Sequence, residues 1–255
     1  MKPNEYFFEF ENVKTRYLRL GKGDPLLFLH GAILGPDPLH RVLEKLSEKF
    51  EVFAPHIPPF GRADSLAGKW DFDDYGRYFD HFINQLNLKK VAIIGNSFGG
   101  GVAVATTIRN NQVSKLILNA SVGISNQTPL RKMLGVTFSD FTLRSLKNSS
   151  GKKDFWPSLV DFVILLKKHL FSLKKTALSI SEMVQKGIES DLAKIKVPTL
   201  ILWGKKDFVL PMEIGFKMKE KIKGAELRIV DGGHSWIQAR PEELTDLIYE
   251  FISKG

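Results

Sequence analysis

Short apolar runs alternate with longer amphipathic segments along most of the chain, and the two patterns predict different elements. The apolar runs are continuous rather than alternating, which is typical of strands buried on both faces of a parallel sheet covered by helices. The longer segments carry apolar residues every three or four positions, the spacing of a helix with one buried face. The sequence therefore predicts strands at 6–10, 13–20, 25–29, 52–54, 91–94, 116–118, 199–203 and 227–230, and helices at 38–50, 72–86, 101–109 and 241–252.

This alternation breaks between residues 123 and 190. The stretch has a helix-like pattern in which basic and apolar segments alternate. It begins after one predicted sheet strand and ends before the next. We interpret it as a small helical cap, or lid, inserted after the sixth strand of a core formed by residues 1–122 and 191–255. The predicted fold class is α/β, with a mostly parallel central sheet flanked by helices.

Composition narrows the class of protein. The chain has 255 residues, 43% of them hydrophobic, and no cysteine. A disulfide framework, a thiolate metal site and a cysteine nucleophile are therefore excluded. No apolar run reaches the roughly 18 residues of a membrane span, and the first ten residues lack the apolar core of a signal peptide. We expect a cytoplasmic protein without a membrane span, and the oligomeric state is left open.

Positive charge is concentrated in the predicted cap. Residues 123–190 carry eleven Lys and Arg against five acids, a net +6 of the chain's +9. Such an excess is typical of a solvated helical face, and it would also suit a segment that meets an anionic substrate. No nucleic-acid-binding motif accompanies the charge, so no nucleic-acid partner is expected.

One serine lies in a context that favours nucleophilic chemistry. Gly95-Asn96-Ser97-Phe98-Gly99 has the spacing G-x-S-x-G and follows a predicted buried strand directly. A helix is predicted just after it, so Ser97 would sit on a strained strand-to-helix turn with its hydroxyl exposed. We predict that Ser97 is a nucleophile.

A serine hydroxyl needs a neighbouring base, itself oriented by a third group. Of the histidines that follow Ser97, His234 comes just after the last predicted strand, whereas His169 lies in the lysine-rich cap. Asp207 follows the penultimate strand and is preferred as the acid over Asp231, which lies too close to His234 along the chain to reach behind its ring. The predicted catalytic residues are Ser97, Asp207 and His234.

The tetrahedral intermediate of acyl transfer also needs backbone donors for its oxyanion. We predict an oxyanion hole from the N–H groups of Phe98 and Ala32, with Ile33 as the alternative to Ala32. His30, in the same loop, would be a buried, hydrogen-bonded histidine.

In this order and context, these motifs resemble those of the α/β-hydrolase superfamily. The likeness covers the core on both sides of the insertion, at Leu29–Gly31, Pro58–Arg62, Gly95–Gly100, Gly204–Asp207 and Gly233–His234. The resemblance implies the α/β-hydrolase fold, the triad roles given above and a lid at residues 123–190. A serine at the elbow argues against haloalkane dehalogenases and epoxide hydrolases, which use an aspartate there.

A finer resemblance is to carbon–carbon bond hydrolases that cleave ring-fission products of aromatic degradation. It rests on Gly95–Gly100 and Asn119–Gly123. The chain departs from that group at 30–35, where their His-Gly-Ser-Gly-Pro-Gly is His-Gly-Ala-Ile-Leu-Gly. It also has Ser235 directly after the histidine, with Trp236 one place later, and His56 where an aspartate is usual.

The leading expectation is a carboxylesterase-like serine hydrolase that cleaves a small or medium acyl ester through an acyl-enzyme, with no metal or organic cofactor. The alternatives are a carbon–carbon hydrolase for ring-fission products, for which Arg131 or Arg144 would face the pocket, a weaker cofactor-free haloperoxidase-like activity, and a ligand receptor on a hydrolase scaffold. The substrate is a small molecule in each enzyme case. The predicted substrate contacts are Ile33, Trp156, Phe208 and Trp236, with further apolar cap residues at Phe155, Phe162, Leu165 and Phe171.

Overall fold

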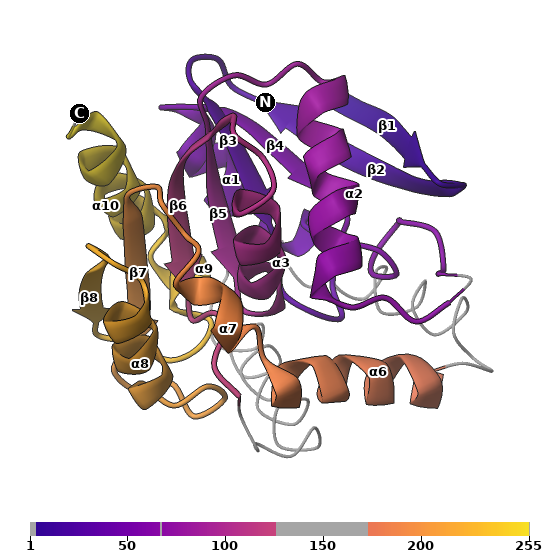
Figure 1. The fold of residues 1–255 in the computed structure, drawn as a ribbon. Helices are drawn as coiled ribbons and strands as arrows, with labels where there is room; N and C mark the ends of the chain where they lie inside the picture. The colour runs from indigo at the N-terminus through magenta and orange to yellow at the C-terminus, as the bar shows by residue number, and fades with distance from the viewer. Residues whose placement is uncertain (1–3, 67, 126–172, 255) are drawn as a thin grey trace.

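The computed structural model describes residues 4–66, 68–125 and 173–254, and these contain one eight-stranded sheet (Figure 1). Its order is β1-β2-β4-β3-β5-β6-β7-β8. The pairs β1–β2 and β2–β4 are antiparallel, and every other pair is parallel. The strands are β1 (Asn4–Phe10), β2 (Val13–Leu20), β3 (Pro25–Leu29), β4 (Glu51–Pro55), β5 (Val91–Asn96), β6 (Val113–Asn119), β7 (Thr199–Gly204) and β8 (Glu226–Val230).

The continuous apolar runs are explained by burial on both faces of this sheet. In β3, Leu26 and Phe28 pack in one core cluster, whereas Leu27 and Leu29 pack in the other. All four side chains are fully buried. Since successive side chains of a strand point to opposite faces, a strand covered on both sides has no position left for a polar residue.

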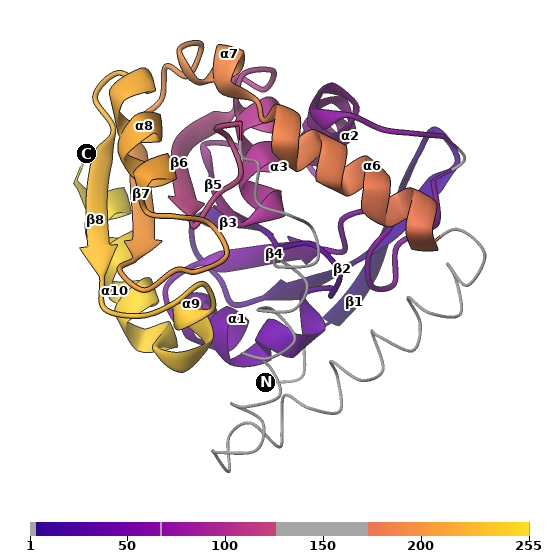
Figure 2. The ribbon, with the colours of Figure 1, turned by 90° about the horizontal axis from the view of Figure 1, so that it is seen from below.

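Helices cover both faces (Figure 2). One face carries α1 (His40–Ser47), α9 (Trp236–Ala239) and α10 (Pro241–Ser253), whose apolar residues share a cluster with one side of the central strands. The other face carries α2 (Phe72–Gln85), α3 (Phe98–Thr107) and α8 (Glu213–Lys221). The predicted α/β architecture, with a mostly parallel sheet between helices, is confirmed.

Local details differ from the sequence prediction at several elements. The helix expected at 38–50 is split into a 3-10 turn at Asp37–Leu39 and the shorter α1. The helix after β5 begins at Phe98, three residues earlier than expected. α8 was not predicted, because it buries only Ile214, Gly215 and Met218 and so has a narrow apolar face.

The part of residues 123–190 that the structure describes consists of 123–125, α6 (Leu173–Lys186) and the residues that lead into α7 (Glu189–Leu192). The two ends of the segment lie side by side, since the Ile188 N–H donates to the Gly123 carbonyl at 2.8 Å. From this point α6 runs beneath the sheet in the view of Figure 1. The cap residues singled out in the sequence, at 131, 144, 155, 156, 162, 165, 169 and 171, lie outside the described residues. Within the described chain, no helix is both long and apolar enough to cross a membrane.

Candidate active site

Ser97 lies on the turn between β5 and α3 and has a strained backbone, with φ 54° and ψ −118°. Non-glycine residues rarely adopt positive φ, so the surrounding structure must hold it in place. The flanking glycines allow this packing. A methyl group on Gly99 would lie 2.2 Å from the Leu29 carbonyl oxygen, and one on Gly95 would lie 2.5 Å from the Gly99 carbonyl oxygen. Glycine is therefore required at both positions by close approach of the backbone.

The structure brings Ser97, His234 and Asp207 into one hydrogen-bonded row. The Ser97 Oγ lies 3.0 Å from His234 Nε2, and His234 Nδ1 lies 2.8 Å from Asp207 Oδ2. The serine comes from the end of β5, the aspartate from the loop after β7 and the histidine from the loop after β8. All three segments lie at the carboxyl edge of the parallel strands, where open α/β sheets bind their ligands.

The Asp207 carboxylate is fixed by its own loop. Its Oδ1 accepts hydrogen bonds from the backbone N–H groups of Val209 at 2.8 Å and Leu210 at 2.9 Å, which leaves Oδ2 for His234. Its side chain is fully buried. The Lys206 N–H also donates to the Gly232 carbonyl at 2.8 Å, so the acid and histidine loops are joined by their backbones. The aspartate can therefore orient the imidazole without moving.

The rival acid occupies a different environment. Asp231 points to solvent, with 75% of its side chain exposed, and pairs with Lys206 at 3.2 Å. It thus makes a surface ion pair with a lysine, whereas the imidazole of His234 faces Asp207.

The loop after β3 carries the second predicted oxyanion donor and is strained as well. The Leu34 N–H donates to the Ala32 carbonyl at 3.1 Å, and Ile33 between them has φ 80°. A hydrogen bond from residue i+2 to residue i around a positive φ is the pattern of the rarer, strained γ-turn, and a β-branched residue is unusual there. This loop faces the elbow, because a methyl group on Gly31 would lie 3.4 Å from Ser97 Cβ.

Phe98 anchors the other side of the predicted oxyanion hole. Its ring is 1% exposed and packs edge-on against Phe60 and Tyr75, with centroids 5.7 and 5.5 Å away. Its backbone N–H belongs to the first turn of α3, where N–H groups have no acceptor within the helix and the helix dipole is positive. An anion next to Ser97 would meet that end of the helix.

The predicted substrate contacts lie in different environments. Ile33 is half-buried beside the elbow, whereas Phe208 follows Asp207 and is 70% exposed. Trp156 lies outside the described residues. Trp236 differs from the expectation, because it is 1% exposed and packs in the core beneath α9. The extra residue Ser235 places the tryptophan at the start of α9, and this helix turns the ring inward.

Beside the oxyanion loop lies a second polar group, which we call the buried charge cluster: Arg16, Asp37 and His56. Arg16 Nη1 donates to both Asp37 oxygens at 2.9 Å, and His56 Nε2 lies 3.1 Å from Asp37 Oδ2. The Arg62 N–H donates to His56 Nδ1 at 2.9 Å, so the neutral imidazole carries its proton on Nε2. Burial raises the pKa of Asp37, but the hydrogen bond and charge of His56, together with Arg16, hold it well below its ordinary value. Burial also lowers the pKa of His56.

His30 connects this cluster to the oxyanion loop. Its Nε2 accepts the Ile57 N–H at 2.7 Å, and its Nδ1 lies 2.6 Å from the Gly31 carbonyl, to which it donates. Complete burial and the charge of His56 lower the pKa of His30 to about 3. His30 is thus a neutral structural histidine that ties the loop after β3 to the loop after β4.

Two asparagines lie at the ends of neighbouring strands, and the sequence alone predicted no role for them. Asn96 ends β5 and Asn119 ends β6, and they are register partners. The Asn119 Nδ2 donates to Asn96 Oδ1 at 2.6 Å. The signal in the sequence is an asparagine at the end of each strand, directly after the apolar runs 91–94 (with Gly95) and 116–118, which places two amides at the edge of the sheet that carries Ser97.

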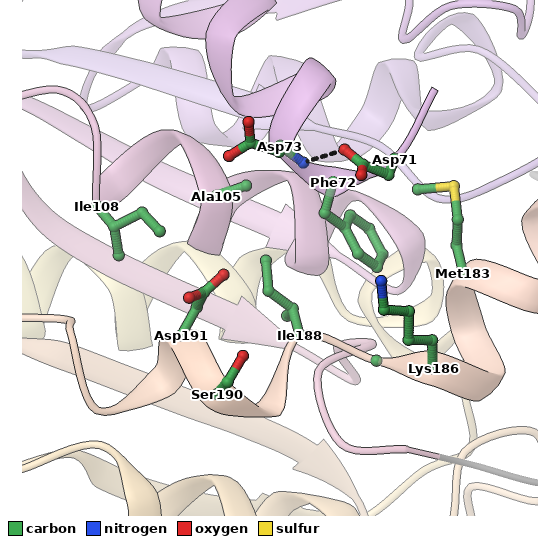
Figure 3. Close-up of a pocket in the computed structure, with 11 residues that line it drawn as sticks. Asp71, Phe72, Asp73, Ala105, Ile108, Met183, Lys186, Ile188, Ser190 and Asp191 are labelled. Atoms are coloured by element: carbon green, nitrogen blue, oxygen red, sulfur yellow. Dashed lines mark hydrogen bonds between the residues drawn. The ribbon is translucent and has the colours of Figure 1, made fainter. Parts of the chain in front are cut away.

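A separate hollow of about 150 Å³ lies between the N-terminus of α2, the C-terminal half of α3 and the α6–α7 junction. Figure 3 shows the residues that line it. Phe72, Ile108 and Ile188 supply apolar walls, and Asp71, Asp73, Asp191 and Lys186 lie around it. The acids have their own partners: Asp71 caps α2, Asp73 pairs with Arg109 and Asp191 pairs with Lys194. None of Ser97, Asp207 and His234 lines this hollow.

The arrangement at the sheet edge suits acyl transfer. The serine oxygen, the imidazole and the carboxylate are within hydrogen-bond reach in the order that a nucleophile, a general base and an orienting group require. Among the residues that the structure describes, no group of three or more His, Asp or Glu side chains is placed to hold a metal ion.

Comparison with known proteins supports the fold. Residues 24–145 match the family model described as alpha/beta hydrolase fold. The chain is 26% identical over 271 residues to the 2-hydroxy-6-oxo-6-(2'-aminophenyl)hexa-2,4-dienoic acid hydrolase of Metapseudomonas resinovorans, covering 98% of this chain and 91% of the relative.

Two solved structures share the fold along nearly the whole chain. The serine hydrolase involved in carbazole degradation (CarC) superposes with a TM-score of 0.79 at 23% identity, covering 99% of each chain. The esterase from Exiguobacterium antarcticum also gives 0.79 at 22% identity, covering 97% of this chain and 99% of the other. The chain therefore has the α/β-hydrolase fold, and it resembles the hydrolases of that superfamily, the meta-cleavage product hydrolases among them.

Proposed function

We propose that the protein is a serine hydrolase that cleaves a small or medium acyl ester through an acyl-enzyme. Ser97 attacks the ester carbonyl while His234 Nε2 takes its proton. Asp207 holds the imidazole in the tautomer that can accept this proton and stabilises the imidazolium that forms. The same imidazolium then returns the proton to the leaving alcohol, and water releases the acid by the reverse sequence.

The observation that carries this proposal is the row of 3.0 and 2.8 Å contacts from Ser97 through His234 to Asp207. It is supported by the strained elbow, because positive φ at a half-buried serine is the kind of strain that clusters at functional sites. We assign the oxyanion hole to the N–H groups of Phe98 and Ala32. Phe98 begins a helix whose positive end faces developing negative charge.

We also propose that residues 123–190 form a lid over this site and supply most of the acyl pocket. The support is the closure of the segment on itself at Gly123 and Ile188, next to the carboxyl edge of the sheet. An ion pair between Lys69 and Glu182 joins α6 to the loop before α2. The substrate is a small molecule that reaches Ser97 between this segment and the core.

A second candidate is the hydrolysis of a carbon–carbon bond in a ring-fission product. It is favoured by the named activity of the Metapseudomonas resinovorans relative, which is a hydrolase of a 2-hydroxy-6-oxo-dienoic acid and matches 98% of this chain. The same serine, histidine and aspartate would serve this reaction, so the substrate has to separate the two candidates.

The test is steady-state hydrolysis of p-nitrophenyl esters from acetate to long acyl chains, with a 2-hydroxy-6-oxo-dienoate assayed in parallel. Ser97→Ala is the blank, and Ser114→Ala, at a surface serine hydrogen-bonded to the Lys90 carbonyl, is the matched control. Ester turnover that depends on chain length and disappears only in Ser97→Ala supports the esterase. Turnover of the dienoate with ester rates at the blank level would reject it in favour of the carbon–carbon hydrolase.

A further inference from the structure

Three side chains form a second hydrogen-bonded row behind the catalytic one. The indole Nε1 of Trp236 donates to Asn119 Oδ1 at 2.8 Å, and Asn119 Nδ2 donates to Asn96 Oδ1 at 2.6 Å. Trp236 follows His234 by two residues, and Asn96 directly precedes Ser97. The row therefore joins the histidine loop to the nucleophile elbow through the end of β6.

The indole of Trp236 determines which way the hydrogen bonds of this row run. An indole N–H can only donate, so the Asn119 atom that faces it must be the amide oxygen. The Asn119 nitrogen then points toward Asn96 and must find an oxygen there. Each amide thus has one allowed orientation, although an asparagine side chain has nearly the same shape when it is turned over.

The environment makes this orientation strict. Asn119 is fully buried and Trp236 is 1% exposed, so water cannot readily replace a lost partner. A turned amide would place two N–H groups or two oxygens against each other in a site of low dielectric constant, which is costly. The Asn119 backbone is held too, because its carbonyl accepts the Ser97 N–H at 2.9 Å.

The consequence falls on the free edge of Asn96. With Oδ1 bound to Asn119, its Nδ2 faces the oxyanion loop: a methyl group built on Gly31 would lie 3.4 Å from Asn96 Nδ2 and equally 3.4 Å from Ser97 Cβ. The half-buried Asn96 thus presents N–H donors beside the serine. Were it turned over, an oxygen would face the position where negative charge develops.

We propose that Asn119 and Trp236 are positioning residues, which hold the Asn96 amide with its donor edge beside Ser97. This inference rests on the proposed serine hydrolase function and adds a role for two residues that lie outside the catalytic row. It also gives the displaced tryptophan a function: its ring is turned into the core, and its N–H sets the polarity of the edge next to the nucleophile.

The test uses Trp236→Phe, which removes the N–H and keeps an aromatic ring in the core. Tyr78→Phe is the matched control, because it also removes a buried hydrogen bond, from the Tyr78 hydroxyl to the Val13 carbonyl at 3.0 Å, which joins α2 to β2. We expect kcat to fall about 10-fold in Trp236→Phe, with a much smaller change in KM, because donors beside the serine act mainly on the transition state. Tyr78→Phe should lose similar thermal stability and keep its kcat.

A second variant reverses the row. In Asn119→Asp, the new carboxylate accepts from both neighbours, so Asn96 must turn its nitrogen inward and its oxygen toward the site. We expect kcat to fall about 100-fold, as for the loss of an oxyanion donor. If this buried charge prevents folding, the proposal is tested with the double variant that combines Trp236→Phe and Asn96→Ala. The double variant should be no slower than Asn96→Ala alone, since both changes remove the same donor.

Two results would overturn the positioning role: a kcat of Trp236→Phe equal to that of Tyr78→Phe, or effects of Trp236→Phe and Asn96→Ala that multiply. The rate at which a fluorophosphonate probe labels Ser97 is measured for every variant as well. If the wild-type protein hydrolyses no ester, the ester function fails. The labelling rates of the variants then decide the positioning role separately, because labelling requires the serine and its donors but no particular substrate.

Discussion

The molecule contains two histidine-centred polar groups that differ in what their surroundings allow. In the proposed catalytic row of Ser97, His234 and Asp207, His234 is partly exposed, and its Nε2 faces only a hydroxyl that can give up a proton. In the buried charge cluster, His56 is fully buried, and its ring nitrogens face the Arg62 N–H and the Asp37 carboxylate. Both histidines have an aspartate partner, so the aspartate alone does not make a histidine a catalyst.

The difference lies in the second nitrogen of each ring. His234 offers Nε2 to the hydroxyl that we propose as the nucleophile, whereas the second nitrogen of His56 accepts a backbone N–H that cannot be deprotonated. A histidine–aspartate pair can therefore serve catalysis or the stability of the fold. Which of the two it serves depends on the partner of the ring nitrogen that does not face the aspartate. Removing the aspartate should accordingly affect activity in one group and folding in the other.

The largest effect is expected for Asp207→Asn. Because Oδ1 is held by the Val209 and Leu210 N–H groups, the asparagine must keep its oxygen there and turn its nitrogen toward His234. The imidazole then has to accept at Nδ1 and carry its proton on Nε2, where it cannot take one from Ser97. We expect kcat to fall about 10⁴-fold, as when other triads are forced into the wrong tautomer, with little change in melting temperature.

The control for this variant is Asp231→Asn, which removes a carboxylate of the surface pair with Lys206. It should keep wild-type kcat in the same ester assay. Equal losses in the two variants would mean that Asp207 has no special relation to His234.

The next largest effect is expected for Asp37→Ala, and it concerns stability. Arg16 Nη1 lies 2.8 Å from His56 Nε2, and both atoms carry hydrogens, so the Asp37 carboxylate is what holds them together. Without it, the buried guanidinium keeps only its ion pair with Glu5, and the facing N–H groups of Arg16 and His56 lose their shared acceptor. We expect the free energy of unfolding to fall by about 3 kcal/mol. Urea denaturation measures this loss, and kcat per folded molecule should change much less.

Asp37→Asn is the graded control, because its oxygen can still accept one of the two donors. It should lie between Asp37→Ala and the wild type in stability. An Asp37→Ala protein as stable as the wild type would show that the cluster contributes nothing to folding.

The same two groups differ in how well the sequence alone predicts them. The elbow, Asp207 and His234 follow sheet strands closely, so the order of the strands alone predicts that their side chains meet at one edge. Arg16 and Asp37 carry no such signal, because an antiparallel strand and a loop before α1 bring them together through tertiary packing. Trp236 shows the same limit on a smaller scale: the start of α9 at this residue turned a predicted substrate contact into a core residue.

Acid should weaken the fold through His30. Burial and the charge of His56 lower its pKa to about 3, whereas in the unfolded chain it is about 6.5. Between these values the unfolded chain binds one more proton, so stability is complete above pH 6.5 and is lost as the pH falls toward 3. From pH 6.5 to 5, His30 alone should cost about 2 kcal/mol of unfolding free energy, and urea denaturation at each pH measures it.

His30→Gln separates this contribution from the rest. Its amide oxygen can still accept the Ile57 N–H that His30 Nε2 accepts, and it does not titrate. The slope of stability against pH should fall by about one proton in this variant. Asp37 acts in the same direction only at lower pH, because its pKa is depressed from an acidic starting value. An unchanged slope between pH 5 and 6.5 would show that another group governs acid sensitivity.

The smallest effect is expected at Ile33, whose strained backbone adjoins the proposed oxyanion donor Ala32. In an ordinary position an alanine variant is more stable than the glycine variant by up to about 1 kcal/mol. At φ 80° the order should be reversed, with Ile33→Gly more stable than Ile33→Ala by about 1 kcal/mol, because only glycine adopts this backbone without strain. If the strained turn positions the Ala32 N–H for the oxyanion, the more stable glycine variant should also have the lower kcat, since its loop is freer to move. Parallel urea and ester measurements on the two variants compare both quantities, and a glycine variant superior in stability and in kcat would show that the strain at Ile33 has no part in catalysis.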